Sequence, residues 1–146
     1  MKNIMGMFTA ALAVAATGAT LSASPAAAAD NCRAGYLCLY SQTNFPYGAG
    51  AGYIVGNGVS NSDLRYAHYP ENNDVVNDSI SSVINNTGHT IRLYENTGYQ
   101  GRYINVAPGG RIADMKKKAL VVFHGDGSIF ANPGEFNDVT SSFKAL

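Results

Sequence analysis

Two six-residue segments of the 146-residue chain carry the side chains best suited to bind a metal ion. Residues 77–82 read Asn-Asp-Ser-Ile-Ser-Ser, and residues 137–142 read Asn-Asp-Val-Thr-Ser-Ser. Each segment offers an amide, a carboxylate and hydroxyl groups, the oxygen donors that hard cations prefer. A single copy is commonly a turn whose polar side chains bond the local backbone. A second copy in a matching position favours calcium, while magnesium fits less well because it keeps several waters in a strict octahedron.

The two segments belong to a longer internal repeat. Leu-Tyr-Ser-Gln-Thr-Asn-Phe at residues 39–45 recurs as Leu-Tyr-Glu-Asn-Thr-Gly-Tyr at residues 93–99, and each copy is followed by a glycine, Gly48 or Gly101. This spacing predicts a hairpin whose rings cover the turn, so we assign the aromatic residues to the core rather than to a carbohydrate-binding surface. Because the elements keep their order, the chain is predicted to contain two copies of one unit, about residues 32–85 and 89–146.

Short apolar or alternating segments, separated by clusters of Gly, Asn, Pro and Ser, make up the rest of this region. No segment keeps a helical apolar period for long, and the pattern is typical of antiparallel strands joined by turns. The fold is therefore predicted to be all-β, with two packed sheets covering apolar faces that neither half could bury alone. The predicted strands are residues 36–40, 53–55, 80–84, 90–94, 102–106, 120–123 and 142–146.

The first 29 residues are expected to be a secretory signal peptide. Lys2 precedes an apolar run over residues 4–21, and a small-residue stretch ends at Ala29, where cleavage is predicted. A transmembrane anchor is the alternative, but the run is rich in Ala, Gly and Thr, and no basic flank follows it. The working domain is then residues 30–146, secreted and without membrane attachment after cleavage.

Cys32 and Cys38 are the only two cysteines, and export favours a disulfide between them. The closed loop is short, so the bond is expected to contribute about 2 kcal/mol and to fix the N-terminal edge. A metal-binding or redox-active pair is the alternative. Zinc would need a second pair of Cys or His ligands, and the spacing is not that of a Cys-x-x-Cys redox motif.

Composition and motifs disfavour two broad classes of function. Ten basic residues balance ten acidic ones, whereas nucleic-acid-binding domains carry a basic surface. The lysines at residues 116–118 form a charge run that is typical of a solvated turn. The three histidines are isolated, and neither a nucleophile elbow, a phosphate loop nor a His-Glu-x-x-His motif occurs. We expect neither a nucleic-acid partner nor an enzyme.

The repeated motifs resemble those of the βγ-crystallin family. The shared features are a Tyr-x4-aromatic-x-Gly hairpin and a following (Asn/Asp)-(Asn/Asp)-x-x-(Ser/Thr)-Ser segment, present in both halves. The segment from Cys32 to Tyr40, behind a signal peptide, also resembles secreted proteins of peptidase inhibitor family I36. The first resemblance implies two Greek-key motifs packed as a βγ-crystallin-like β-sandwich, each giving one strand to the other's sheet. It also implies two calcium sites between the repeated loops.

The resemblance also assigns roles to motif positions. The first two positions supply side chains, the third a backbone carbonyl and the fifth a hydroxyl, and the residue after the hairpin tyrosine often adds a carbonyl. In this chain the implied calcium ligands are Asn77, Asp78, Ser79, Ser81, Asn137, Asp138, Val139, Ser141, Ser41 and Glu95. One departure is that Gly48 is displaced by one residue, which predicts a bulge at the first corner.

Two functions remain open from the sequence. The chain is either a secreted calcium-binding domain that inhibits a peptidase, or a non-inhibitory extracellular structural or stress-protective module in which calcium serves stability only. Inhibition would need a rigid loop whose ordering cost is met before binding. The candidate connections are residues 57–74, the longest polar one, and residues 107–113.

Overall fold

The computed structural model describes residues 32–46, 52–116, 122–129 and 136–146. The expected signal peptide and Gly48 lie outside these ranges. The elements are β1 (Tyr36–Tyr40), β2 (Tyr53–Gly56), the 3-10 turn η1 (Leu64–Tyr66), β3 (Ser82–Asn85), β4 (Ile91–Asn96), β5 (Gln100–Val106), β6 (Arg111–Ile112) and β7 (Ser142–Ala145). Within the described ranges, no helix has both the length and the apolar character needed to cross a membrane.

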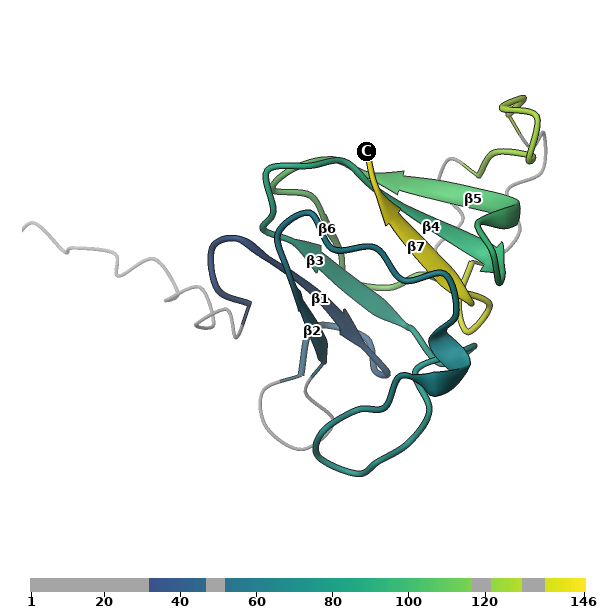
Figure 1. Ribbon diagram of the computed structural model, residues 1–146. Coiled ribbons are helices and arrows are strands. Elements are labelled where there is room, and N and C mark those ends of the chain that lie inside the picture. Colours follow the sequence, from purple (N-terminus) through teal and green to yellow (C-terminus); the bar gives the residue numbers. More distant parts are fainter. Residues whose placement is uncertain (1–31, 47–51, 117–121, 130–135) are drawn as a thin grey trace, which may run out of the picture.

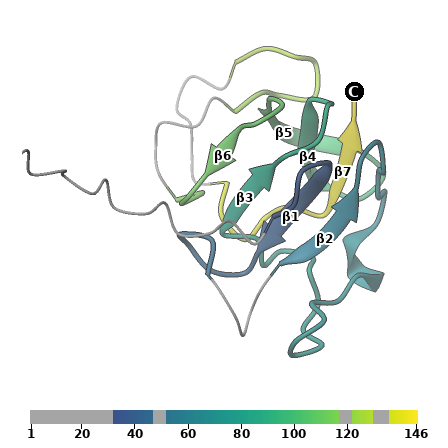
Figure 2. The same cartoon turned by 90° about the vertical axis from the view of Figure 1, so that its left-hand side faces the viewer.

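The strands form two antiparallel sheets that pack against each other (Figure 1; turned by 90° in Figure 2). The first has the order β2-β1-β3-β6 and the second the order β5-β4-β7. The second half thus gives β6 to the first sheet, where Ile112 pairs with Val83. In return, Asn61 of the first half makes an antiparallel bridge to Phe143 of β7. The predicted exchange between two Greek keys is present, although the first half contributes a single bridge.

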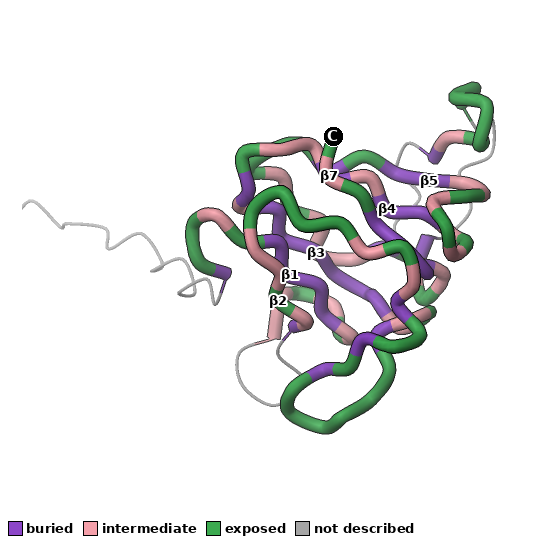
Figure 3. The backbone as a smooth tube through the Cα atoms, in the orientation of Figure 1, coloured by how far each residue is buried: buried purple, intermediate pink, exposed green. Residues whose placement is uncertain are grey.

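Successive side chains of each strand point to opposite faces of its sheet, and those on the inner faces form one core between the sheets. In β1, Leu37 and Leu39 point inward, and in β4, Ile91 and Leu93 do so, each at most 1% exposed. Side chains from both halves meet in this cluster. In Figure 3 the buried residues, in purple, lie along strands of both sheets. The two halves therefore pack into one shared core, as expected for two packed sheets.

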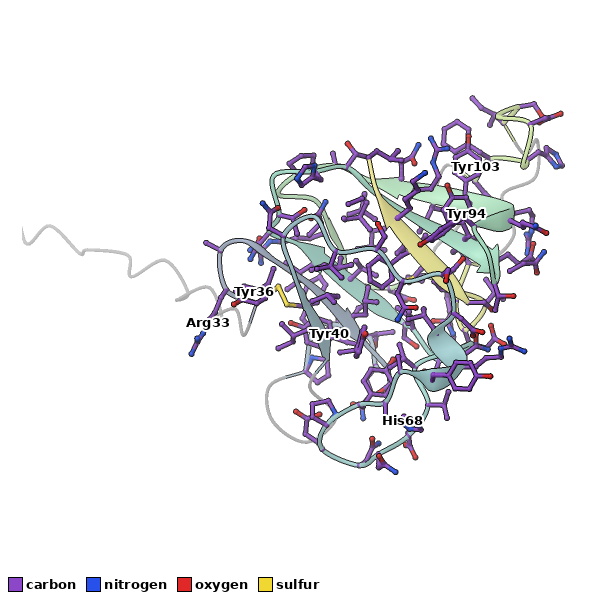
Figure 4. All side chains as sticks on the ribbon, viewed as in Figure 1. Arg33, Tyr36, Tyr40, His68, Tyr94 and Tyr103 are labelled. Atoms are coloured by element: carbon purple, nitrogen blue, oxygen red, sulfur yellow. A yellow bond between two sulfur atoms is a disulfide. The ribbon has the colours of Figure 1, made fainter. Side chains whose placement is uncertain are left out.

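A second, smaller cluster lies on the outer face of the first sheet. It joins Cys38 and Tyr40 of β1 with Ile84 of β3 and with Cys32, and Phe45 packs partly against it. Cys32 and Cys38 form the predicted disulfide, with 5.8 Å between their Cα atoms (Figure 4). The bond holds the N-terminal segment over a sheet face that would otherwise expose apolar side chains.

Two predicted strands need correction, and one strand was missed. The segment 80–84 becomes a strand only at Ser82, because Ile80 and Ser81 belong to the first repeated loop. Of the segment 120–123, the part up to residue 121 lies outside the described ranges, and Phe123 makes isolated bridges to Tyr103 and Ile129. Strand β6 was not predicted; it lies inside the connection 107–113 and, with two residues, is too short to show an alternation.

Candidate functional site

The two repeated loops lie side by side and exchange hydrogen bonds. The Ser81 hydroxyl donates to Oδ1 of Asp138 over 3.1 Å, and the Ser141 hydroxyl donates to Oδ1 of Asp78 over 3.0 Å. The backbone repeats the exchange, since the Asp78 amide bonds the Thr140 carbonyl and the Asp138 amide bonds the Ile80 carbonyl, both at 3.1 Å. Each Asp–Ser pair therefore draws one residue from each half, as a pseudo-twofold axis requires.

The two hairpins hold these loops in place. The Ser81 amide donates to the Tyr40 carbonyl over 2.7 Å, and the Ser141 amide donates to the Tyr94 carbonyl over 2.9 Å. Figure 4 labels both tyrosines, one on each sheet. These bonds bring Ser41 and Glu95, the residues after the tyrosines, next to the loops. The structure therefore places all ten expected ligands on the two loops or on the hairpins bonded to them.

Backbone conformation and burial repeat between the loops as well. Asp78 and Asp138 both have φ of 53°, a left-handed angle that Asp tolerates better than most residues. Residues 76–82 and 136–142 follow the same sequence of buried, half-buried and exposed positions. The aspartates are exposed, whereas Ser81 and Ser141 are buried. An ion could therefore reach the carboxylates from solvent, whereas the serine hydroxyls lie on the buried side of the loops.

Each loop also contains an unsatisfied acceptor. The Asn77 amide nitrogen donates to Oδ2 of Asp78 over 2.6 Å, and the Asn137 nitrogen makes the same bond to Asp138. The amide oxygens of Asn77 and Asn137 are buried, and no described residue donates a hydrogen bond to either. Such a group costs about 1–3 kcal/mol when left unpaired, and a bound ion is one way to satisfy it. The donor set thus fits a hard cation.

Two implied ligands can act through their backbone carbonyls only. The Glu95 carboxylate is bound by Arg102, with Oε1 2.6 Å from Nη2 and Oε2 3.0 Å from Nε, and this bond lowers the pKa of Glu95. Val139 has no side-chain oxygen that could bind a metal ion. At the matching position of the first loop, the Ser79 hydroxyl is already used in a hydrogen bond to the Val76 carbonyl, 2.8 Å away. The carbonyl roles implied for these positions agree with this arrangement.

Softer metals have little to bind. No three His, Cys, Asp or Glu side chains gather into a metal-binding group within the described ranges. The two thiols are joined in the disulfide. Zinc and copper sites draw mainly on imidazole and thiolate ligands, whereas the loops offer oxygen atoms.

Sequence reasoning missed one polar centre, the side chain of Asn85. Its amide nitrogen donates to the carbonyls of His89, Val106 and Ala107 at 2.8–3.1 Å, and its oxygen accepts from the amide and hydroxyl of Thr87. Asn85 is fully buried. The residue joins the end of β3 to the connection before β6, and an Asn-Asn-Thr-Gly turn in the sequence carries no signal of such long-range bonds.

Comparisons with known proteins agree on fold and family. The sequence matches the peptidase inhibitor family I36 over residues 25–106, more than half of the chain, and no curated protein matches it. A structure described as "Evolution of the eye lens beta-gamma-crystallin domain fold" is 21% identical with a TM-score of 0.54, over 80% of this chain and 89% of that one. A βγ-crystallin from Ciona intestinalis is 21% identical with a TM-score of 0.51, over 77% and 100%. At these identities the likeness concerns the fold, and it confirms the predicted βγ-crystallin architecture.

Proposed function

The chain belongs to the peptidase inhibitor family I36, a family of proteins that are not enzymes, and from this premise we propose that it is a calcium-stabilised inhibitor of a secreted peptidase. The βγ-crystallin fold supplies the scaffold. The paired loops supply the candidate calcium ligands, and exposed connections supply the surface for the peptidase. Each part of this proposal has a separate test.

The calcium part rests on one observation, the two Asp–Ser pairs that cross between the loops beside unpaired amide oxygens. We assign one site to Asp78, Ser141 and Asn77 and the other to Asp138, Ser81 and Asn137. The backbone carbonyls of Ser79, Val139, Ser41 and Glu95 complete the proposed donor set. A calcium ion bound in either site would neutralise the carboxylate of that site and would tie the two halves together, because each site draws ligands from both loops.

Thermal unfolding in excess calcium and in chelator, at matched ionic strength, tests this part. At a calcium concentration one hundred times the Kd, each filled site stabilises the folded state by about 2.7 kcal/mol. For a domain of this size we expect the Tm to rise by about 10 °C for each filled site. The double variant Asp78→Asn, Asp138→Asn is the control and should lose the shift. An equal shift in the double variant, or with magnesium in place of calcium, would refute the proposed sites.

The inhibitor part is tested by titrating a fixed amount of peptidase with the purified protein. A panel of one metallopeptidase and several serine peptidases is suitable, because membership of the family supports a peptidase partner and leaves its class open. We expect activity to fall in a straight line to a one-to-one endpoint. A calcium-dependent Tm shift without inhibition of any panel member would favour the alternative, a module in which calcium serves stability only.

We propose further that the chain is secreted after cleavage behind Ala29. The Cys32–Cys38 disulfide supports this location, because such bonds persist outside the reducing cytosol. Expression in the source cell followed by N-terminal sequencing of the protein in the medium tests it. The expected first residue is Asp30, and retention of the uncleaved chain in the cell would contradict the proposal.

A further inference from the structure

The connection between η1 and β3 contains a short hairpin, residues 68–75, that projects from the body of the molecule. Figures 1 and 2 show it beyond the edges of both sheets, and Figure 3 shows its exposed tip in green. His68 and Val75 form an antiparallel bridge at its base, and the Tyr69 amide donates to the Asp74 carbonyl over 2.9 Å. Residues 70–74 are all exposed. Within the long connection 57–74, this hairpin is the part that projects beyond the sheets.

Bonds within the 68–75 hairpin fix the shape of its tip. The Asn73 amide donates to the Tyr69 carbonyl over 2.9 Å, and Asn73 has φ of 59°. The Asn72 side chain bonds Asp74 twice, as donor to Oδ2 at 2.6 Å and as acceptor from the backbone amide at 3.0 Å. Nδ1 of His68 lies 3.0 Å from the Asn73 carbonyl oxygen. A surface that is ordered before binding loses less entropy when a partner covers it.

Buried side chains anchor the base of the hairpin to the core. Tyr69 and Val76 are at most 1% exposed. The Ser79 hydroxyl lies 2.8 Å from the Val76 carbonyl oxygen, 3.0 Å from that of Val75 and 3.2 Å from the Tyr69 hydroxyl. It can therefore donate to a carbonyl and accept from the phenol, whose pKa is raised to about 12 by burial and which stays protonated. Ser79, which belongs to the first repeated loop, therefore connects the two strands at the base of the hairpin.

The charged side chains near the hairpin tip are negative, and the other exposed residues of the hairpin are His68, Pro70, Asn72, Asn73 and Val75. Glu71 and Asp74 lie near the tip, and the sequence has no Lys or Arg between Tyr66 and Ile91. Arg65, the nearest basic residue before the hairpin, is paired with Asp63 at 2.6 Å. Among the described residues, no side chain forms a hydrogen bond or ion pair with Glu71. Tyr66 beside the hairpin is 81% exposed and Val75 is 41% exposed, so apolar surface flanks the acidic tip.

The other candidate connection, residues 107–113, is bound flat against the first sheet. The Gly109 amide donates to the Asn85 carbonyl over 2.7 Å, and the Asn85 amide donates to the Gly110 carbonyl over 2.9 Å. The connection then continues into β6, which pairs with β3. Its backbone is therefore used inside the fold, and the 68–75 hairpin is the better shaped of the two for entering a cleft.

We propose that the 68–75 hairpin is the surface that enters the substrate cleft of the inhibited peptidase, and that this cleft is positively charged. The inference rests on the proposed inhibitory function and names its contact surface. The tip enters as a turn, whereas peptides commonly bind in clefts as extended strands. With Asn73 left-handed and the Asn73 and Asp74 amides bonded inside the hairpin, the tip fills the cleft without offering an extended bond for cleavage.

Charge variants of Glu71 test the contact. The panel is a glutamate-specific endopeptidase, thermolysin, and trypsin, whose specificity pocket carries an aspartate. We expect the wild-type chain to inhibit the glutamate-specific enzyme most strongly and trypsin least. Glu71→Lys should raise the inhibition constant about 100-fold and Glu71→Gln less, because a like charge would face the cleft. Gln100→Lys adds a lysine on β5, away from the hairpin, and serves as the control with little expected effect.

The outcomes separate the two proposals. Inhibition by the wild-type chain that survives Glu71→Lys overturns the hairpin assignment and leaves the inhibitory function standing. Stronger inhibition of trypsin than of the glutamate-specific enzyme overturns the proposed charge of the cleft. If the wild-type chain inhibits no member of the panel, the inhibitory function and the hairpin assignment fall together. A Tm equal to that of the wild type shows that each variant is folded.

Ser79 is proposed as a positioning residue for the hairpin, and its test reads out cleavage rather than inhibition. Ser79→Val introduces the residue found at the matching position of the second loop, Val139, and keeps the backbone carbonyl. With a peptidase that the chain does not inhibit, we expect cuts within residues 68–75, mapped by mass spectrometry, to appear about five to ten times faster. Ser79→Thr should restore the wild-type rate, and Val139→Ser should not change it. Equal cleavage in Ser79→Val and wild type would refute the role.

Discussion

In the first half of the molecule, the hairpin after β1 is supported by the Cys32–Cys38 disulfide and by an edge-to-face contact of Tyr40 with Phe45, 6.0 Å between ring centroids. In the second half, the hairpin after β4 has the ion pair of Glu95 with Arg102, and Tyr94 packs 5.8 Å from both Tyr99 and Tyr103. Besides the aromatic contact, the hairpins share a serine bridge: the Ser82 hydroxyl donates to the Gln42 carbonyl and accepts from the Phe45 amide, and the Ser142 hydroxyl makes the same two bonds with Asn96 and Tyr99. The disulfide and the ion pair are the parts that differ.

The loops between these hairpins are nearly the same. Their aspartates have equal φ angles, their serines cross to the opposite half at 3.0 and 3.1 Å, and both asparagine oxygens lack partners among the described residues. The two copies therefore differ in the disulfide and the ion pair, and agree in the loops and in the serine bridges to the hairpins. The agreement of the loops and of these bridges indicates a shared constraint.

The largest expected effect comes from the core that both halves share. Leu39 and Leu93 occupy matching positions of β1 and β4, and neither is exposed. Leu39→Ala and Leu93→Ala should each lower the free energy of unfolding by about 2–5 kcal/mol, because each leaves a cavity. Urea unfolding followed by fluorescence and by circular dichroism measures the loss. Two separate transitions in either variant would show that the halves unfold independently, against the single core described above.

Asn85 gives the next largest expected effect and has no polar counterpart in the second half, where Ala145 stands at the matching position. Asn85→Ala should cost about 2–3 kcal/mol, since it removes the partner of three carbonyls and of Thr87 in a buried site. Ala145→Ser is the matched control and should change the free energy of unfolding by less than about 0.5 kcal/mol. Equal losses in the two variants, measured by urea unfolding, would contradict this asymmetry.

Removal of the disulfide should weaken the first half by a smaller amount. In the double variant Cys32→Ser, Cys38→Ser we expect a loss of about 2 kcal/mol, because the short loop is no longer closed in the unfolded chain. Thermal unfolding with and without a reductant measures the effect in the wild type and in the variant. Reductant should lower the Tm of the wild type alone, and a wild-type Tm that resists complete reduction would contradict the expectation.

The ion pair of the second half should have the smallest effect. Arg102 lowers the pKa of Glu95 below its ordinary value of 4.5, so the pair stabilises the folded state above that pH and the contribution is lost as the pH falls through the lowered pKa. The partly exposed pair is screened by solvent, and about 0.5 kcal/mol is expected. Glu95→Gln should remove this share of the acid sensitivity. Tm profiles from pH 3 to 7 that coincide for wild type and variant would show no contribution.

A structural feature of this molecule could be predicted from the sequence when the residues that determine it are close together in the chain. The strand β1, the disulfide and the repeated loops were predicted with their residues, because alternation, cysteine spacing and turn composition are local signals. Strand β6 and the bonds of Asn85 to Val106 and Ala107 could not be predicted, since they depend on partners about twenty or more residues away. For the candidate site, the sequence named the residues, and the fold added that each serine pairs with the aspartate of the other loop.

The exchange of β6 also sets an order for folding during synthesis. A chain emerging from its N-terminus completes β1, β2 and β3 well before Ile112 is available to pair with Val83. Until then the free edge of β3 has unpaired amides and carbonyls, which can recruit strands from neighbouring nascent chains. A molecule with this topology therefore covers the β3 edge only when almost four-fifths of its length has been made, and a chain truncated before residue 111 would leave that edge open.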